Sequence, residues 1–180
     1  MTRAFLAIPL PDDVIDALTR VQQGLPEGRA VAHDNLHLTL VFLGDVGAEA
    51  LEDLHDTLSA VRAGPITLRI DGLDLFGGER PRSLWARVVA GPELGALQTR
   101  LESTARRAKI DVPRRRFVPH VTLARFRPGG GVSDGFHRYL VDRAGFALPA
   151  FDVHRFSLYT STLYEDGPVY DVLAEYPLTG

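Results

Sequence analysis

Residues 35–44, NLHLTLVFLG, form an apolar run with a histidine and a threonine inside it. Such a run is typical of a buried strand, where an imidazole and a hydroxyl need hydrogen-bond partners or they cost stability. Side chains two residues apart on a strand share a face, so His37 and Thr39 point to one side and Leu38 to the other. The strand is therefore expected to bury one face and to present an imidazole and a hydroxyl on the opposite face.

The same pattern occurs again at residues 117–126, FVPHVTLARF. Here His120 and Thr122 share a face, and Val121 points away from it. A single histidine with a threonine two residues later is most simply a core residue with satisfied hydrogen bonds. A matched pair of such segments, each continued by leucine, favours a shared functional site built by two similar halves of the chain.

The composition is that of a globular domain. The chain has 180 residues, 45% of them hydrophobic and 24% charged, which suits one domain or one domain of two lobes. The formal net charge of -3 gives no overall basic field that would indicate nucleic acid. Cysteine is absent, which excludes disulfides, thiolate nucleophiles and thiolate metal ligands. The early apolar run FLAIPL is too short for a signal-peptide core or a membrane span, so we expect a soluble, cytoplasmic protein without a membrane partner.

Strands and helices alternate along the chain with similar weight. We predict helices at residues 12–25, 47–62, 92–109 and 133–141. We predict strands at residues 4–10, 35–44, 66–76, 83–90, 150–160 and 168–176, besides the second histidine strand, and a turn at residues 77–82, GGERPR. This alternation indicates an α/β or α+β fold.

Two imidazoles and two hydroxyls on facing strands suit the hydrolysis of a phosphodiester without a metal ion. One neutral imidazole takes a proton from water, while a protonated imidazole donates a proton to the leaving alkoxide. The hydroxyls can hydrogen-bond the non-bridging phosphate oxygens as negative charge builds up on them. If both pKa values are near the ordinary 6.5, the state with one proton on the correct imidazole holds about 18% of the enzyme at pH 7. A bell-shaped pH profile is then expected without special tuning of either pKa.

Six segments carry a family resemblance, and they occur in the order RAFLAIPLP, NLHLTLVFLG, LFGGERPRSLWARV, FVPHVTLARF, FSLYTSTL and GPVYDVLAEYPL. With its two His-x-Thr-Leu motifs the chain resembles the 2H phosphoesterase superfamily. Over essentially its whole length it is similar to the bacterial and archaeal RNA 2',3'-cyclic phosphodiesterases, formerly called 2'-5' RNA ligases. The resemblance implies an α+β fold in which residues 1–180 form one domain of two pseudo-symmetric lobes. Antiparallel sheets would surround a central cleft, with helices outside and one motif in each lobe, at residues 37–40 and 120–123.

The resemblance also implies a reaction, the opening of a 2',3'-cyclic phosphate at an RNA end to a 2'-phosphate without a metal or cofactor. Carried over by motif position, His37 is expected to be the proton donor to the departing O3'. His120 is expected to be the proton acceptor that activates water, while Thr39 and Thr122 hold phosphate oxygens. The chemistry is symmetric, so this division of roles rests on the resemblance alone. We expect a monomer whose partner is RNA carrying such an end.

Three further residues are candidates for substrate binding. Arg125 matches the family pattern HxTLxR, but on a regular strand it would face away from His120, so a bend or a β-bulge would be needed to bring it to the site. Arg116 belongs to an arginine-rich run before the second motif, which could contact an RNA backbone or could equally be a solvated loop. Phe42 could stack on a terminal base, although most aromatic residues on apolar strands belong to the core.

Other interpretations stay open at the level of sequence. His33 and His37 are four residues apart, a spacing that on a helix suggests a metal pair. Asp34 and Asn35 instead indicate a loop entering a strand, so no metal site is predicted. The site could act on 2'-5' oligoadenylates or small cyclic nucleotides, could catalyse reversible ATP-independent 2'-5' ligation, or could bind RNA ends without catalysis. Ala30 stands where family members often carry tryptophan, which leaves substrate length and base preference undecided.

Overall fold

The computed structural model describes residues 1–78 and 80–180. The predicted turn at residues 77–82 includes Glu79, so that part of the prediction lies outside the described residues. Within the described chain the helices are α1 (Asp12–Gln22), α2 (Ala48–Ser59), α3 (Pro92–Arg107) and α4 (Asp134–Asp142), with one short 3-10 turn, η1 (His33–Asn35). The strands are β1 (Thr2–Pro9), β2 (Arg29–Ala30), β3 (His37–Val46), β4 (Ile66–Phe76), β5 (Ser83–Ala90), β6 (His120–Arg125), β7 (Phe151–Val153), β8 (Arg155–Tyr164) and β9 (Gly167–Pro177).

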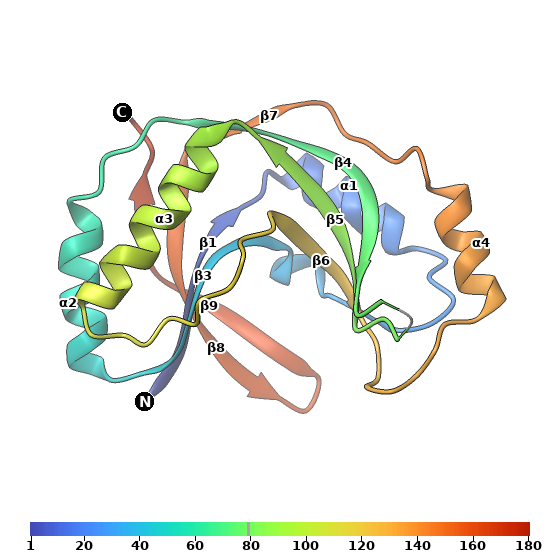
Figure 1. Cartoon of the computed structure of the whole chain (residues 1–180), viewed down its shortest axis with the longest axis horizontal. Helices are drawn as coiled ribbons and strands as arrows, with labels where there is room; N and C mark the ends of the chain where they lie inside the picture. The colour runs from blue at the N-terminus through green and yellow to red at the C-terminus, as the bar shows by residue number, and fades with distance from the viewer. Residues whose placement is uncertain (79) are drawn as a thin grey trace.

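The strands form one curled sheet with the order β7-β4-β5-β6-β3-β1-β8-β9, and β2 pairs with β6 (Figure 1). Every pairing between neighbouring strands is antiparallel. The order is symmetric about its centre, because β5, β4 and β7 follow β6 outward as β1, β8 and β9 follow β3. The two strands that carry the histidine motifs are therefore the two central strands of the sheet.

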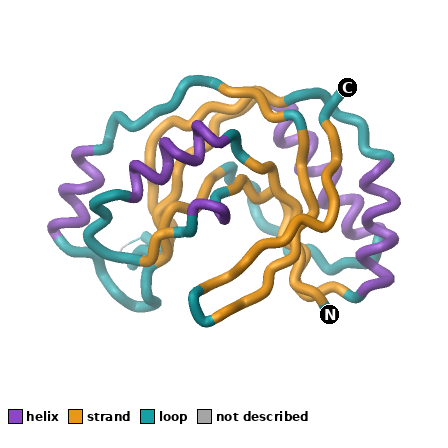
Figure 2. The backbone as a smooth tube through the Cα atoms, turned by 180° about the vertical axis from the view of Figure 1, so that it is seen from behind, coloured by secondary structure: helices purple, strands orange, loops and turns teal. Residues whose placement is uncertain are grey.

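Two pairs of helices cover the two halves of the sheet, and Figure 2 shows them from behind in purple. Figure 1 shows α2 with α3 at one end of the molecule and α1 with α4 at the other. Helix α3 follows β5 in the chain but contacts β3, and α1 follows β1 but contacts β6. The hydroxyl of Tyr139 in α4 donates a hydrogen bond to the carbonyl of Val21 in α1. The helices thus cross from one half of the sheet to the other and tie the halves together.

The core forms where the apolar faces of these elements meet. On α1 the buried residues Val14, Leu18 and Val21 recur at helical spacing, and on β3 the fully buried Leu38 lies between two half-buried polar residues. Burying one such aliphatic side chain stabilises the fold by about 1.5–3 kcal/mol, so the alternation along β3 fixes which face of the strand points inward. The opposite face is left to His37 and Thr39.

The predicted α+β class is confirmed, and the two antiparallel sheets expected for the lobes are joined into one. The single strand predicted at residues 150–160 is wrong, because β7 pairs with β4 and β8 pairs with β1, in opposite halves of the sheet. The buried residues Val153 and Phe156 are three apart, which breaks the period of two, and the chain crosses between the halves there. Strand β2 and the turn η1 were not predicted. No helix within the described residues is long and apolar enough to cross a membrane.

Candidate active site

The two motif strands meet at a single residue pair. Leu38 of β3 pairs with Val121 of β6, and each of these residues lies between the histidine and the threonine of its own motif. Both side chains are fully buried. Because side chains alternate along a strand, both histidines and both threonines project from the other face of the sheet, around this pair. The strand pairing therefore brings the four predicted side chains together, namely His37, Thr39, His120 and Thr122.

The His37 imidazole is held at both nitrogens. Its Nδ1 lies 2.7 Å from the backbone carbonyl oxygen of Asn35, and its Nε2 lies 2.9 Å from the hydroxyl oxygen of Thr39. A carbonyl can only accept, so Nδ1 carries the proton of the neutral ring and Nε2 accepts from the Thr39 hydroxyl. The side-chain amide of Asn35 also donates to the carbonyl of Pro168 at 2.7 Å, which links this support to the β8–β9 hairpin.

The His120 imidazole has an equivalent support. Its Nδ1 lies 2.6 Å from the backbone carbonyl oxygen of Val118, two residues earlier, just as Asn35 is two residues before His37. Nδ1 is again the donor, so the lone pair of the neutral ring is on Nε2. Both imidazoles can therefore take a proton at Nε2 as a base, or donate one from Nε2 as an acid.

Aromatic rings surround both imidazoles, with different geometry at the two sites. The Phe5 ring stacks on His37 with centroids 4.9 Å apart, and Tyr170 of the hairpin meets His37 edge-on at 5.3 Å. At the other motif, Phe76 and Trp85 both meet His120 edge-on, at 4.9 and 5.6 Å. These contacts restrict ring rotation, so each Nε2 keeps a fixed direction.

Burial changes the protonation of both histidines. Loss of hydration lowers the pKa of His37 to about 4, opposed by its hydrogen bond to Asn35. Burial likewise lowers the pKa of His120, opposed by the bond to Val118. The charge of Arg125 lowers the pKa of both rings further, and His120 lowers that of His37. The expectation that both pKa values stay near 6.5 is therefore wrong, because sequence spacing does not show how far a strand is buried.

Two β-bulges at equivalent positions shape the site. Along β6, Ala124 pairs with Leu84 and Thr122 pairs with Trp85, which leaves Leu123 without a partner residue on β5. A bulged residue reverses the alternation that follows it, and Arg125 is turned to the face that carries His120. Arg125 needed a bend or a β-bulge to reach the site, and the structure has a bulge there. The effect of Arg125 on both imidazoles agrees with this position.

The matching bulge on β3 lies at Leu40, between the pairs Leu6–Val41 and Ala7–Thr39. Phe42 consequently takes the place on β3 that Arg125 has on β6. Its ring is 61% exposed, and its centroid lies 6.4 Å from that of Phe5, which stacks on His37. An exposed aromatic surface and a guanidinium thus flank the two imidazoles on opposite sides.

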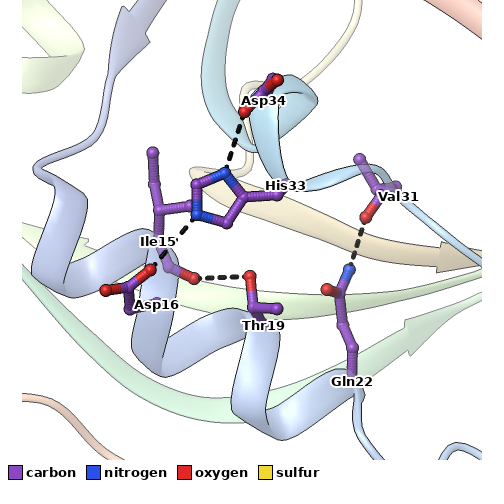
Figure 3. Close-up of polar contacts among 7 residues, drawn as sticks. All are labelled: Ile15, Asp16, Thr19, Gln22, Val31, His33 and Asp34. Atoms are coloured by element: carbon purple, nitrogen blue, oxygen red, sulfur yellow. Dashed lines mark hydrogen bonds and ion pairs between the residues drawn. The ribbon is translucent and has the colours of Figure 1, made fainter.

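The bulge on β6 is held from outside the sheet. The Gln22 side-chain amide on α1 lies 2.8 Å from the Leu123 carbonyl and 2.8 Å from the Val31 carbonyl, and it donates to both (Figure 3 shows the contact with Val31). The Val31 amide also donates to the Leu123 carbonyl at 2.8 Å. The backbone oxygen that the bulge removes from the ladder is therefore satisfied, so α1 supports the position of Arg125.

Other predicted residues lie apart from the imidazoles. Arg116 is exposed on the loop before β6, and its charge does not contribute to the lowered pKa of either histidine, so its contact with substrate stays a prediction. His33 lies between Asp16, 3.2 Å away, and Asp34, 2.9 Å away, at the surface (Figure 3). Among the described residues no group of three histidine or acidic side chains is arranged to hold a metal ion.

Several residues around the site were not found from the sequence. Phe5, Tyr170 and Trp85 reach the imidazoles from strands whose pairing is long-range, so no local pattern indicates them. Gln22 has no sequence signal, since a helix surface glutamine is ordinary. Asn35 does have a sequence signal in its position. It stands two residues before His37, as Val118 stands two residues before His120.

Comparison with known proteins agrees with this architecture. The profile of the 2'-5' RNA ligase superfamily matches residues 10–164, and the chain belongs to this family. It is 34% identical over 181 residues to the RNA 2',3'-cyclic phosphodiesterase of Escherichia coli, covering 98% of this chain and 97% of that protein. The RNA 2',3'-cyclic phosphodiesterase of Geobacillus stearothermophilus is 30% identical over 183 residues, and the match covers 98% of this chain but 57% of the length of that protein. The crystal structure of E. coli LigT in apo form superposes with a TM-score of 0.79 at 29% identity, covering 99% of this chain and 98% of that one.

Proposed function

We propose that this protein hydrolyses a 2',3'-cyclic phosphate at the end of an RNA to a 2'-phosphomonoester, without a metal ion or cofactor. The observation that carries the proposal is the Leu38–Val121 pair, around which two imidazoles, each supported at Nδ1 by a backbone carbonyl, share one face. The names of the relatives from E. coli and G. stearothermophilus support the same substrate. The reaction needs one acid and one base near a single phosphorus atom, and the two motifs supply them.

In the proposed reaction water attacks phosphorus while the bond from phosphorus to O3' breaks. Nε2 of neutral His120 takes the proton from water, and the proton on Nε2 of protonated His37 passes to O3'. The negative charge that develops on the non-bridging oxygens would be met by Thr39, Thr122 and Arg125. The assignment of His37 as donor and His120 as acceptor follows the family resemblance.

Phosphate binding would favour protonation of His37, with the proton taken from solvent. The lowered pKa leaves His37 neutral at pH 7, and its Nε2 accepts from Thr39. An anion beside the ring favours the imidazolium, which raises the pKa. Once Nε2 carries a proton it no longer accepts from Thr39, so that hydroxyl becomes available to a phosphate oxygen. Substrate binding and proton loading of the acid would thus occur together.

The same site could also join RNA ends, with a ribose 5'-hydroxyl in place of water. His120 would take the proton from that hydroxyl, His37 would protonate the departing O3', and a 2'-5' linkage would form. The site could also act on 2'-5' oligoadenylates or small cyclic nucleotides, which present the same reacting group. A protein that only binds RNA ends would need neither imidazole to change its proton. The support of Nδ1 by a carbonyl at both motifs favours catalysis over binding alone.

The test is a short RNA ending in a 2',3'-cyclic phosphate, incubated with the protein in excess EDTA. The 2'- and 3'-phosphate products are resolved for the parent, His37→Ala and His120→Ala, with RNA binding measured for each. We expect the 2'-phosphate from the parent and a loss of at least about a thousandfold in both variants, with binding retained. A 3'-phosphate product, or equal turnover by the variants, would refute the assigned chemistry. Binding without turnover by any form would favour the RNA-end binder.

A further inference from the structure

A second arginine, Arg29, lies beside the site on the short strand β2. Arg29 is paired with Arg125 across the β2–β6 ladder, and Ala30 is paired with Ala124. Residues directly opposite on antiparallel strands project to the same face, with Cβ atoms about 4.5–5.5 Å apart. Arg125 faces the imidazoles because of the bulge at Leu123, so the Arg29 side chain leaves the sheet on the same face.

The far end of the Arg29 side chain lies at the tip of the β8–β9 hairpin. A Cβ atom placed on Gly167 would be 2.9 Å from Nη2 of Arg29, so the missing side chain at Gly167 leaves room for the guanidinium. The next hairpin residue, Pro168, accepts the hydrogen bond from Asn35, and Tyr170 contacts the His37 ring. Arg29 therefore lies between the hairpin and β6, on a strand that pairs with β6 beyond the Leu38–Val121 pair.

Two like charges opposite each other on a ladder destabilise it. No ion pair involves Arg29 or Arg125 within residues 1–78 and 80–180. Both arginine side chains are exposed. Hydrogen bonds among Gln22, Val31 and Leu123 hold β2 on β6 in spite of the repulsion between the two charges. An anion between the guanidiniums would remove the repulsion and would receive charge-assisted hydrogen bonds from both.

We propose that Arg29 and Arg125 form a phosphodiester subsite for the internucleotide phosphate that precedes the reacting end of the RNA. This inference rests on the proposed function and deepens it, because it makes an RNA chain the preferred substrate over a mononucleotide. The reacting phosphate lies among the two imidazoles and two threonines. Arg125 spans both positions, whereas Arg29, which extends to the hairpin tip, contacts the next phosphate.

The experiment compares adenosine 2',3'-cyclic phosphate, which has one phosphate, with the dinucleotide ApA ending in a 2',3'-cyclic phosphate. Parent, Arg29→Gln and Arg29→Lys proteins are assayed on both. For Arg29→Gln we expect a KM about tenfold higher on the dinucleotide and within about twofold of the parent on the mononucleotide. Arg29→Lys, which keeps the charge, should recover part of the loss. The slope of log KM against log salt on the dinucleotide should fall by about 0.7, the change for one phosphate contact on a single strand.

A dinucleotide with an uncharged methylphosphonate between its nucleosides tests the contact from the ligand side. The parent should lose its preference for this dinucleotide over the mononucleotide, and Arg29→Gln should not distinguish the charged and uncharged forms. Arg138→Gln, the same charge change at an exposed position on α4, is the matched control and should behave as the parent.

Binding of the product dinucleotide, ApA with a terminal 2'-phosphate, is measured alongside turnover so that the two proposals fail separately. If no protein turns over either substrate, but the parent binds the product dinucleotide more tightly than Arg29→Gln does, the hydrolysis is refuted and the subsite is kept. Equal loss on mononucleotide and dinucleotide would show that Arg29 supports the reacting centre or the fold, and no loss on either would show that the subsite does not exist.

Discussion

Leu38 and Val121 are the one residue pair that joins β3 to β6, and each lies at the centre of a His-x-Thr motif. The pseudo-symmetric sheet order is centred on this contact. Diagonal neighbours on such a ladder are about 7–8 Å apart, a separation that lets one phosphate lie between the two imidazoles. The spacing of the two imidazoles is therefore set by two buried aliphatic side chains on the opposite face of the sheet.

Truncation of this pair should affect both stability and activity. Leu38→Ala is expected to lower the free energy of unfolding by about 2–5 kcal/mol, because a fully buried leucine is replaced by a cavity. It should also lower kcat by about tenfold or more in the molecules that remain folded, since small displacements of catalytic groups are costly. Denaturant unfolding and assays at a temperature where the variant is folded measure both effects.

Leu163→Ala is the control for this truncation, because Leu163 is 79% exposed on the hairpin and should change stability by no more than about 0.5 kcal/mol. A Leu38→Ala protein that is destabilised but keeps full kcat would show that the pair does not set the spacing of the motifs.

Acid should destabilise the unliganded protein through His37. The pKa of this residue is 6.5 in a free chain and about 4 when folded, so the unfolded chain binds more protons between these values. The stabilising contribution is complete above pH 6.5 and is lost as the pH falls toward 4, by up to about 3 kcal/mol. Unfolding free energies measured at several pH values should show a shallower fall for His37→Gln. An NMR titration that gives His37 a pKa near 6.5 would contradict the burial argument.

Removing the charge of Arg125 should raise the pKa of both histidines. The guanidinium lowers both values, so Arg125→Gln removes an unfavourable interaction with each imidazolium. NMR titration of the imidazole Hε1 resonances measures the two shifts directly. The charge of Arg127, two residues further along, lowers the pKa of neither histidine. Arg127→Gln should therefore leave both titrations unchanged. A shift at only one imidazole would mean that the Arg125 guanidinium acts on that ring alone.

Gln22 should influence the site although it lies on a helix outside the sheet. Gln22→Leu leaves the partly buried carbonyls of Leu123 and Val31 with one donor fewer each, which costs about 1–3 kcal/mol. Relaxation of the bulge would also turn Arg125 away, so the histidine pKa values should rise as they do in Arg125→Gln. The neighbouring change Gln23→Leu, at an exposed side chain, is the matched control. Loss of stability with unchanged histidine titrations would indicate that the bulge holds without Gln22.

Local sequence patterns are enough to predict the two His-x-Thr motifs, the faces on which their side chains project and the α+β class. These follow from local regularities, because the alternation of side chains along a strand and the spacing along a helix are properties of neighbouring residues. The family resemblance placed Arg125 at the site, and the alternation along the strand then called for a bend or a bulge before it. The structure has that bulge at Leu123.

Tertiary structure alone decided which strands pair and in which register. The junction at Leu38 and Val121, the break between β7 and β8, and the placement of Arg29 beside Arg125 all depend on hydrogen bonds between segments distant in the chain. The lowered histidine pKa values belong to the same class, because hydration depends on everything packed around the ring. Local sequence specifies what a residue can do, and long-range packing specifies which residues do it together.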